Sequence, residues 1–299
     1  MLPCPDRSVL RRPQYSLMRT FDFGAPFFPF FPPLQSAEGA MAHEIRSMCI
    51  SKLRELADAE RLAPDFISDA QRDGDGGVSE AGRQFLLIWL REFNAFFGLA
   101  PDSFAVAASL VDSMLELTRV KPEHADLVGV ACLRIAAQMV GAVELQPTPR
   151  ELCINCDNTF SEQDLDRMET IVYNKLQGHF HKVVPFDFLS ELLQLAALSS
   201  GPPILATGAF EAVVSTRLLT SCFYYELMSY RPSTIALAVL VFELNRLAPE
   251  FDTAALADRI GAVLFVPVWD LDNCARCLAK VTARPGIHAE DGATSETEP

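Results

Sequence analysis

The sequence predicts an all-α protein built from two similar helical lobes, and three observations favour this fold class. From residue 79 onward, apolar residues recur at three- and four-residue steps, the spacing that places side chains on one helix face. Prolines and helix-capping residues punctuate the pattern, and no stretch alternates like a strand bounded by hairpin turns. About five helical segments fall in each of two runs of roughly 100 residues.

The two ends of the chain differ from this helical region. Residues 1–40 are expected to be a disordered arm, in which residues 20–34 have the sequence TFDFGAPFFPFFPPL. The proline spacing forbids a helix there and disfavours a central strand. Two interpretations stay open: an arm that lies loosely on its own fold, or an extended segment that docks into an aromatic-lined groove. Residues 286–299 carry four acidic and no basic side chains and are expected to form a disordered acidic tail, with Thr294, Ser295 and Thr297 as candidate phosphorylation sites.

Residues 41–81 are expected to form an N-terminal helix followed by a linker. The apolar stripe of the helix consists of Ile45, Met48, Leu53 and Leu56. Residues 70–78 contain the sequence DGDGG, which is typical of a linker. A calcium-binding EF-hand loop is excluded here. With Gly76 at the sixth position of such a loop, the twelfth position is Gly82 and not the required glutamate.

Residues 82–182 are expected to form the first lobe. Its first helix carries an inward stripe of Phe85, Leu86, Trp89, Leu90, Phe93 and Phe97. Local signals then mark the starts of the following helices: Asp102 as an N-cap, Pro122 as a first helical residue, and two capping boxes, Thr148 with Glu151 and Ser161 with Asp164.

Residues 183–285 are expected to form the second lobe. Its candidate helices are 186–198, 208–228, 233–247, 253–265 and 271–283, with Asp252 and Asp272 as N-caps. Prolines separate these segments, since proline interrupts a helix interior but is tolerated at its start.

Composition and charge exclude several classes of protein. The chain of 299 residues has 25 basic and 39 acidic side chains, a net charge of -14. This acidity argues against nucleic acid and against an anionic membrane surface as partners, because both require clustered Lys and Arg. We see no export signal and no apolar run of membrane-spanning length. The eight cysteines are therefore expected to be reduced thiols of an intracellular protein.

No motif points to catalysis or to a cofactor. Phosphate-binding loops, dinucleotide fingerprints, nucleophile elbows and His-Glu-x-x-His sequences are all missing, so we do not expect an enzyme. Two cysteine pairs, Cys153 with Cys156 and Cys274 with Cys277, could supply four thiolates for a structural zinc. The pairs fall in different predicted lobes at helical spacing, so we expect buried apolar cysteines and no metal.

Four segments resemble the cyclin box, closest to that of the G-type and I-type cyclins. They are RQFLLIWLREFNAFFGL, DSFAVAASLVDSML, VKPEHADLVGVACLRIAAQ and FSEQDLDRMETIVYNKL, in family order over about 110 residues. The Arg-Met-Glu of the last segment is the most specific element. In the second lobe, RPSTIALAVLVFEL is similar to a helix of the family's second fold. The resemblance implies the cyclin fold: two five-helix cyclin-box lobes preceded by an N-terminal helix.

The resemblance also implies residue roles. Arg83 and Asp112 match a family pair that braces the first two box helices, and Leu127 matches a core position of the third. Glu169 matches a fifth-helix glutamate that faces a kinase. Its usual lysine partner on the third helix is here Gln138, which keeps hydrogen-bonding capacity but has no charge.

A substrate-docking patch is implied on the first box helix. Its positions fall on Gly82, Leu86 and Trp89, with Glu92 at an acidic edge. An aromatic floor beside a carboxylate fits a ligand of the Arg-x-Leu type. The alternative, in which Trp89 is simply a core residue, stays open.

The resemblance implies a non-catalytic regulatory subunit in cell-cycle control that binds a cyclin-dependent protein kinase, in the nucleus and cytoplasm. The alternative is a cyclin-fold adaptor whose main partner is not a kinase, for example a protein phosphatase 2A regulatory subunit. The uncharged Gln138 favours that alternative. A transcription-factor relative with the same helical repeat is disfavoured by the acidity of the chain.

Overall fold

The computed structural model describes residues 38–62, 77–141, 146–177, 180, 182–199 and 201–283. Within these ranges the chain forms helices and no strand, so the all-α prediction is confirmed. Residues 1–37 of the predicted disordered arm and the predicted tail 286–299 lie outside these ranges, whereas residues 38–40 of that arm are helical, so its predicted end was wrong. None of the helices in the described ranges has the length and apolar composition needed to cross a bilayer.

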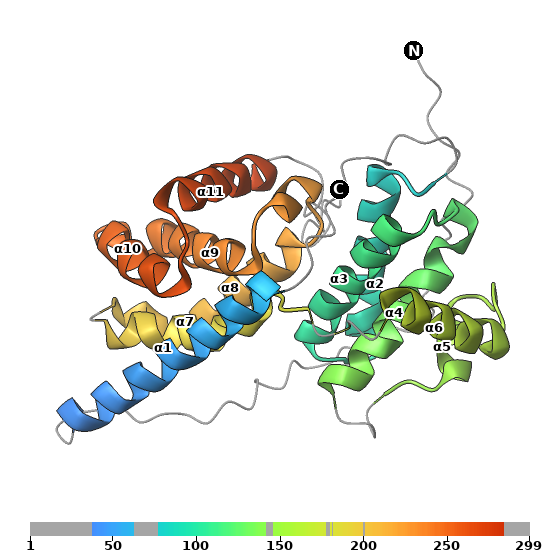
Figure 1. Ribbon diagram of the computed structural model, residues 1–299, viewed down its shortest axis with the longest axis horizontal. Coiled ribbons are helices and arrows are strands. Elements are labelled where there is room, and N and C mark those ends of the chain that lie inside the picture. Colours follow the sequence, from blue (N-terminus) through green and yellow to red (C-terminus); the bar gives the residue numbers. More distant parts are fainter. Residues whose placement is uncertain are drawn as a thin grey trace, which may run out of the picture.

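The helices form two lobes and one preceding helix (Figure 1). The preceding helix is α1 (Glu38–Leu62). The N-terminal lobe contains α2 (Glu80–Phe96), α3 (Pro101–Leu117), η1 (Pro122–His124), α4 (Ala125–Val140), α5 (Pro149–Asn155) and α6 (Glu162–Leu176). The C-terminal lobe contains η3 (Pro185–Phe188), α7 (Leu189–Leu198), η4 (Pro203–Ala206), α8 (Gly208–Ser221), η5 (Tyr225–Ser229), α9 (Pro232–Leu247), α10 (Thr253–Leu264) and α11 (Val268–Thr282).

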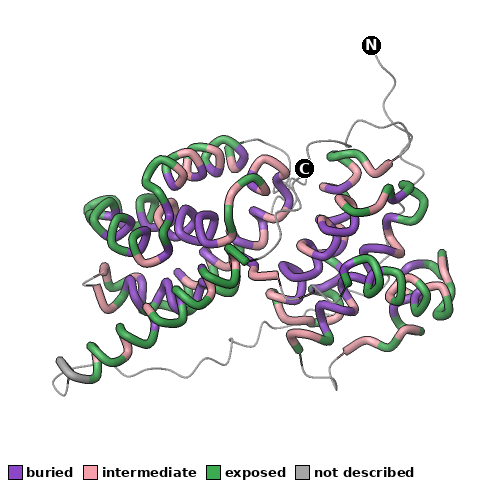
Figure 2. The backbone as a smooth tube through the Cα atoms, viewed as in Figure 1, coloured by how far each residue is buried: buried purple, intermediate pink, exposed green. Residues whose placement is uncertain are grey.

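Each lobe is built around one central helix, α4 or α9, most of whose residues are buried (Figure 2). Helix α4 packs against α2, α3 and α6, and α9 packs against α8, α10 and α11. Small residues make the close packing of α4 possible. At Gly129, a Cβ atom would lie 2.9 Å from Cδ1 of Leu86, so α2 approaches α4 more closely there than any larger residue would allow without a shift.

Helix α1 precedes the N-terminal lobe in sequence but packs on the C-terminal lobe, against α7, α9 and α10. Its buried stripe is Cys49, Leu53 and Ala57, which repeats every four residues. Met48, predicted to face inward, is instead 65% exposed. The error is one of helical phase, since Met48 lies about 100° around the helix from Cys49.

Local capping signals were largely predictive. Both capping boxes form, at Thr148 and at Ser161, and Asp252 caps α10 by accepting the amide of Ala255 at 3.2 Å. The prediction for Asp102 was wrong, because α3 begins at Pro101 and Asp102 lies within its first turn. The prediction for Asp272 was also wrong, because α11 begins four residues earlier, at Val268 after Pro267.

The predicted helix over 208–228 is divided into α8 and η5. No proline or glycine interrupts this segment after its first residue, so its break has a tertiary cause. Phe223 leaves the C-terminal lobe and is buried in the core of the N-terminal lobe, where its ring lies 5.9 Å from that of Phe104. Burial of a large aromatic ring outweighs the cost of ending a helix turn early.

Candidate functional site

The first group of functional candidates lies where α2 meets α3. Arg83 donates from Nε and Nη2 to the two carboxylate oxygens of Asp112, at 2.6 and 2.9 Å. Both side chains are largely buried. Burial works against the charge of Arg83, but the attraction of Asp112 outweighs it, so the pKa of Arg83 is raised. The two residues therefore hold α2 and α3 together as a two-pronged ion pair.

Arg83 also reaches the other lobe. Its guanidinium donates to the backbone carbonyl oxygens of Cys222 at 3.0 Å and Phe223 at 3.3 Å. These carbonyls belong to the segment that carries the Phe223 ring into the N-terminal core. One guanidinium thus joins α2, α3 and the lobe junction, a connection that the sequence did not reveal.

Leu127, predicted as a core residue of the third box helix, lies at the edge of the core. Its side chain is only partly buried, while the adjacent Val128 is 2% exposed. The two positions differ by about 100° of helical rotation, which places Val128 toward the centre of the lobe.

The second group lies on the paired helices α4 and α6. Glu169 accepts a hydrogen bond from Arg134 Nη1 at 2.7 Å, and the same nitrogen lies 3.2 Å from Asp166 Oδ1. The side chains of Arg134 and Glu169 are 19% and 14% exposed, whereas Asp166 faces solvent. Partial burial raises the pKa of Glu169, and the charge of Arg134 opposes the rise.

The expected pairing of Glu169 with Gln138 is therefore corrected. Gln138 is exposed and lies one helical turn beyond Arg134 on α4. The positive charge that the family's lysine would supply at position 138 comes in this chain from Arg134. The charge of Glu169 is therefore balanced within the chain, by Arg134.

The third group was the predicted docking patch on α2, and the structure changes its membership. Leu86 is 1% exposed and points into the core, so its side chain cannot form a wall of a surface patch. Trp89 is partly buried, with its ring stacked on that of Phe93 at 5.0 Å, and Glu92 is exposed. Trp89 is thus partly the core residue and partly the patch residue that the sequence allowed, since it packs on Phe93 and is only partly buried.

Sequence reasoning missed two exposed aromatic residues on the same face of α2. Phe85 and Phe96 are 62% and 48% exposed. They lie four residues before and seven after Trp89, on one face of the helix together with Glu92. Phe85 was assigned to the inward stripe beside Leu86, since adjacent apolar residues leave the helical phase undecided.

The two cysteine pairs do not converge. Cys156 on the α5 side packs in the core of the N-terminal lobe, and Cys274 on α11 packs in that of the C-terminal lobe. Burial raises the pKa of both thiols to about 12. Among the described residues, no group of three or more His, Cys, Asp and Glu is arranged to hold a metal ion. These cysteines act as small apolar residues of the two cores.

Known proteins resemble this chain in sequence and in fold. A family model described as cyclin, N-terminal domain, matches residues 40–181. The solved structure of a viral cyclin from herpesvirus saimiri superimposes with a TM-score of 0.64 at 19% identity, covering 76% of this chain and 95% of the viral chain. The chain therefore has the cyclin fold, and residues 40–181, just under half of its length, are similar to the cyclin N-terminal domain.

Similar cyclins come from several types. Cyclin-A1-2 of rice is 28% identical over 188 residues, which cover 63% of this chain and 38% of the rice protein. Human Cyclin-I2 is 25% identical over 170 residues, or 55% of this chain and 46% of the human protein. Rice Cyclin-B2-1 is 25% identical over 187 residues, or 62% of this chain and 41% of that protein. The chain thus aligns with less than half the length of these cyclins.

Proposed function

We propose that this chain is a cyclin, a non-catalytic regulatory subunit that binds a cyclin-dependent protein kinase in cell-cycle control. The observation that carries the proposal is the ion-paired cluster of Arg134, Glu169 and Asp166 on the surface shared by α4 and α6. In the cyclin N-terminal domain this is the surface to which the resemblance assigns kinase contact. Gln138 adds an exposed amide one turn away.

The mechanism follows from the rigidity of that surface. Arg134 fixes the carboxylate of Glu169 by a charge-assisted hydrogen bond, and the two side chains are only 19% and 14% exposed. A pre-ordered surface loses little side-chain entropy on binding, which favours affinity for a mobile helix of a kinase. The regulator then acts by population shift, stabilising the kinase conformation in which the catalytic ion pair forms.

We further propose that the chain stands nearest to the G-type and I-type cyclins. The sequence Phe96-Phe97-Gly98 at the end of α2 supports this placement, because it resembles the Phe-Phe-Gly that ends the first box helix in G-type members. We also propose the exposed face of Phe85, Trp89 and Glu92 on α2 as the substrate-docking patch, in place of the version that included Leu86.

Co-purification with a panel of kinase catalytic subunits tests the proposal. Glu169→Arg should abolish kinase capture, because it reverses the charge at the contact. Arg134→Gln should weaken capture, because it leaves the Glu169 carboxylate without its ion-pair partner. Glu123→Arg is the matched control, since it makes the same charge change on an exposed side chain before the start of α4. Thermal unfolding of each variant separates lost binding from lost folding.

If Glu169→Arg captures kinase as well as the control does, the contact surface is wrong. Gln138→Lys should change capture only slightly, because Arg134 already supplies the positive charge near Glu169. The phosphatase-adaptor alternative rested on the uncharged Gln138, and this support is weakened by Arg134. It becomes the better hypothesis if no kinase is retained and a phosphatase 2A subunit is.

A location in the nucleus and cytoplasm belongs to the same proposal. A fluorescent fusion of the full chain tests it, and exclusion of the fusion from either compartment would contradict it.

A further inference from the structure

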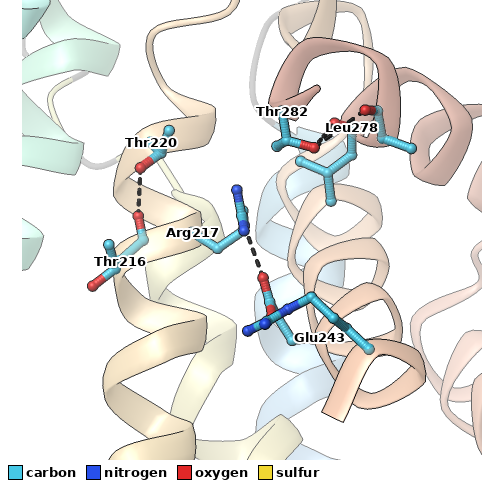
Figure 3. Close-up of polar contacts among 8 residues, drawn as sticks. Thr216, Arg217, Thr220, Glu243, Leu278 and Thr282 are labelled. Atoms are coloured by element: carbon cyan, nitrogen blue, oxygen red, sulfur yellow. Dashed lines mark hydrogen bonds and ion pairs between the residues drawn. The ribbon is translucent and has the colours of Figure 1, made fainter. Parts of the chain in front are cut away.

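The C-terminal lobe contains a buried carboxylate held by two arginines. Glu243 on α9 is 0% exposed and accepts from Arg217 Nε on α8 at 2.8 Å (Figure 3). Its other oxygen accepts from Arg246 Nε at 2.7 Å, one turn further along α9. One carboxylate balances one guanidinium, so the three side chains together carry a net positive charge.

The two guanidinium groups are fixed in place but only partly used. Each bonds to Glu243 through Nε alone, and in the described part of the chain no acceptor bonds to the terminal amino groups of Arg217 or Arg246. Arg217 and Arg246 are 24% and 49% exposed, so these donors are within reach of solvent. The face of the Arg217 guanidinium lies over the Phe242 ring at 5.5 Å, which leaves its polar edge as the available surface.

Stability alone does not account for this arrangement. A buried ion pair is often matched or exceeded in stability by apolar side chains of similar size. Two cations on one carboxylate also repel each other, and an additional anion would relieve that repulsion. The cluster therefore has the charge and the free donors of an anion site that is supported from beneath by a buried carboxylate.

We propose that Arg217 and Arg246 bind the phosphate group of a phosphorylated serine or threonine side chain. A phosphate monoester carries a charge of about −1.5 to −2 at neutral pH and offers three acceptor oxygens, which suits two guanidinium edges. Arginine's fixed fork of donors matches this geometry better than the point charge of a lysine. The site lies in the lobe opposite to the proposed kinase surface, so the inference does not depend on the proposed function.

Two sources could supply this phosphate. One is the chain's own tail, which contains Thr294, Ser295 and Thr297 and follows α11. Helix α11 packs on α9, and Figure 3 shows its Leu278 and Thr282 in the same view as Arg217 and Glu243. The other source is a phosphorylated segment of another protein, and the experiment distinguishes them.

The test measures peptide binding to the full chain by isothermal titration calorimetry. The probes are a synthetic peptide of residues 288–299 phosphorylated on Ser295, the same peptide without phosphate, and a phosphorylated peptide of scrambled order. The phosphorylated probes should bind at least about tenfold more tightly than the unphosphorylated one, the effect of adding charge-assisted hydrogen bonds. Preference for the tail sequence over the scrambled sequence identifies the tail as the source. Equal affinity shows that the site reads the phosphate without selecting the tail sequence, which favours a segment of another protein.

Substitution of the arginines locates the site. Arg246→Gln should weaken phosphopeptide binding about tenfold or more while the Arg217–Glu243 pair preserves the fold. Arg217→Gln should weaken it similarly. Arg259→Gln is the matched control, since Arg259 is exposed on α10 and its Nε bonds to the Ala255 carbonyl of its own helix. The proposal is overturned if wild-type protein does not discriminate the phosphorylated tail peptide, or if the control loses as much affinity as Arg246→Gln.

Discussion

The bond between Arg83 and Asp112 provides the sharpest test of the lobe architecture. Asp112→Asn keeps the shape of the side chain but removes its charge, leaving a guanidinium that is 6% exposed without its counter-ion. Breaking a buried ion pair from one side costs about 3–5 kcal/mol. Asn retains one acceptor and the Cys222 and Phe223 carbonyls still bind Arg83, so we expect the lower end, about 3 kcal/mol.

Urea unfolding followed by circular dichroism and by tryptophan fluorescence measures this cost, and coincident transitions would justify a single free energy of unfolding. Arg83→Met should cost more than Asp112→Asn, because it also removes the bonds to the second lobe. Hydrogen exchange should then accelerate around Phe223 and Tyr224, which Asp112→Asn leaves protected.

The double variant Arg83→Met with Asp112→Leu removes both charges together. Its cost should fall well below the sum of the single changes, since neither partner is left buried and unpaired. Glu123→Gln removes the charge from an exposed contact to Lys121 and should change the free energy of unfolding by less than about 0.5 kcal/mol. A loss below about 1 kcal/mol for Asp112→Asn, or strict additivity in the double variant, would refute the role assigned to this ion pair.

Three further predictions concern single elements. The backbone amide and the hydroxyl of Thr148 donate to Glu151 and hold the pKa of its carboxyl below the usual 4.5. The cap therefore stabilises α5 fully above pH 4.5, and this stabilisation is lost as the pH falls through the folded-state pKa. Thr148→Ala should raise the titration midpoint of the Glu151 carboxyl measured by NMR. Burial raises the pKa of the Cys156 thiol to about 12. At mildly alkaline pH, iodoacetamide should therefore alkylate Cys156 far more slowly in the native protein than in the urea-unfolded protein. Equal alkylation rates would contradict the burial of this thiol. Leu53→Ala should lower the free energy of unfolding by about 2–5 kcal/mol, because Leu53 is fully buried. Met48→Ala should change it by less than about 0.5 kcal/mol, because Met48 is exposed. Comparable losses would show that α1 buries a different face from the one described.

The features that the sequence predicted correctly are those whose causes are local. A capping box joins residues three positions apart, so Thr148 and Ser161 could be identified without knowing the fold. The all-helical class follows from periodicity that recurs along most of the chain. The end of α8 could not be predicted this way, because its cause is Phe223 entering the core of the other lobe.

The site was predicted less well for a similar reason. Whether Glu169 meets position 134 or position 138 depends on how far α6 is shifted along α4, which no residue spacing within either helix fixes. On α2, Phe85 and Leu86 are neighbouring apolar residues, so a rotation of about 100° decides which one is buried. Tertiary packing settles both questions.

The position of α1 has a consequence for synthesis of the chain. Cys49 on α1 bonds to Gln194 on α7, and the two residues are 145 positions apart. At a translation rate of about 5–20 residues per second, the 145 residues between Cys49 and Gln194 take about 7–29 s to synthesise, so α1 is made that long before its binding surface on α7. During that interval its apolar stripe has no native partner, which makes the nascent chain a substrate for chaperones and proteases before the C-terminal lobe is complete. The abundance of this protein is thus expected to depend on how quickly the ribosome reaches the second lobe.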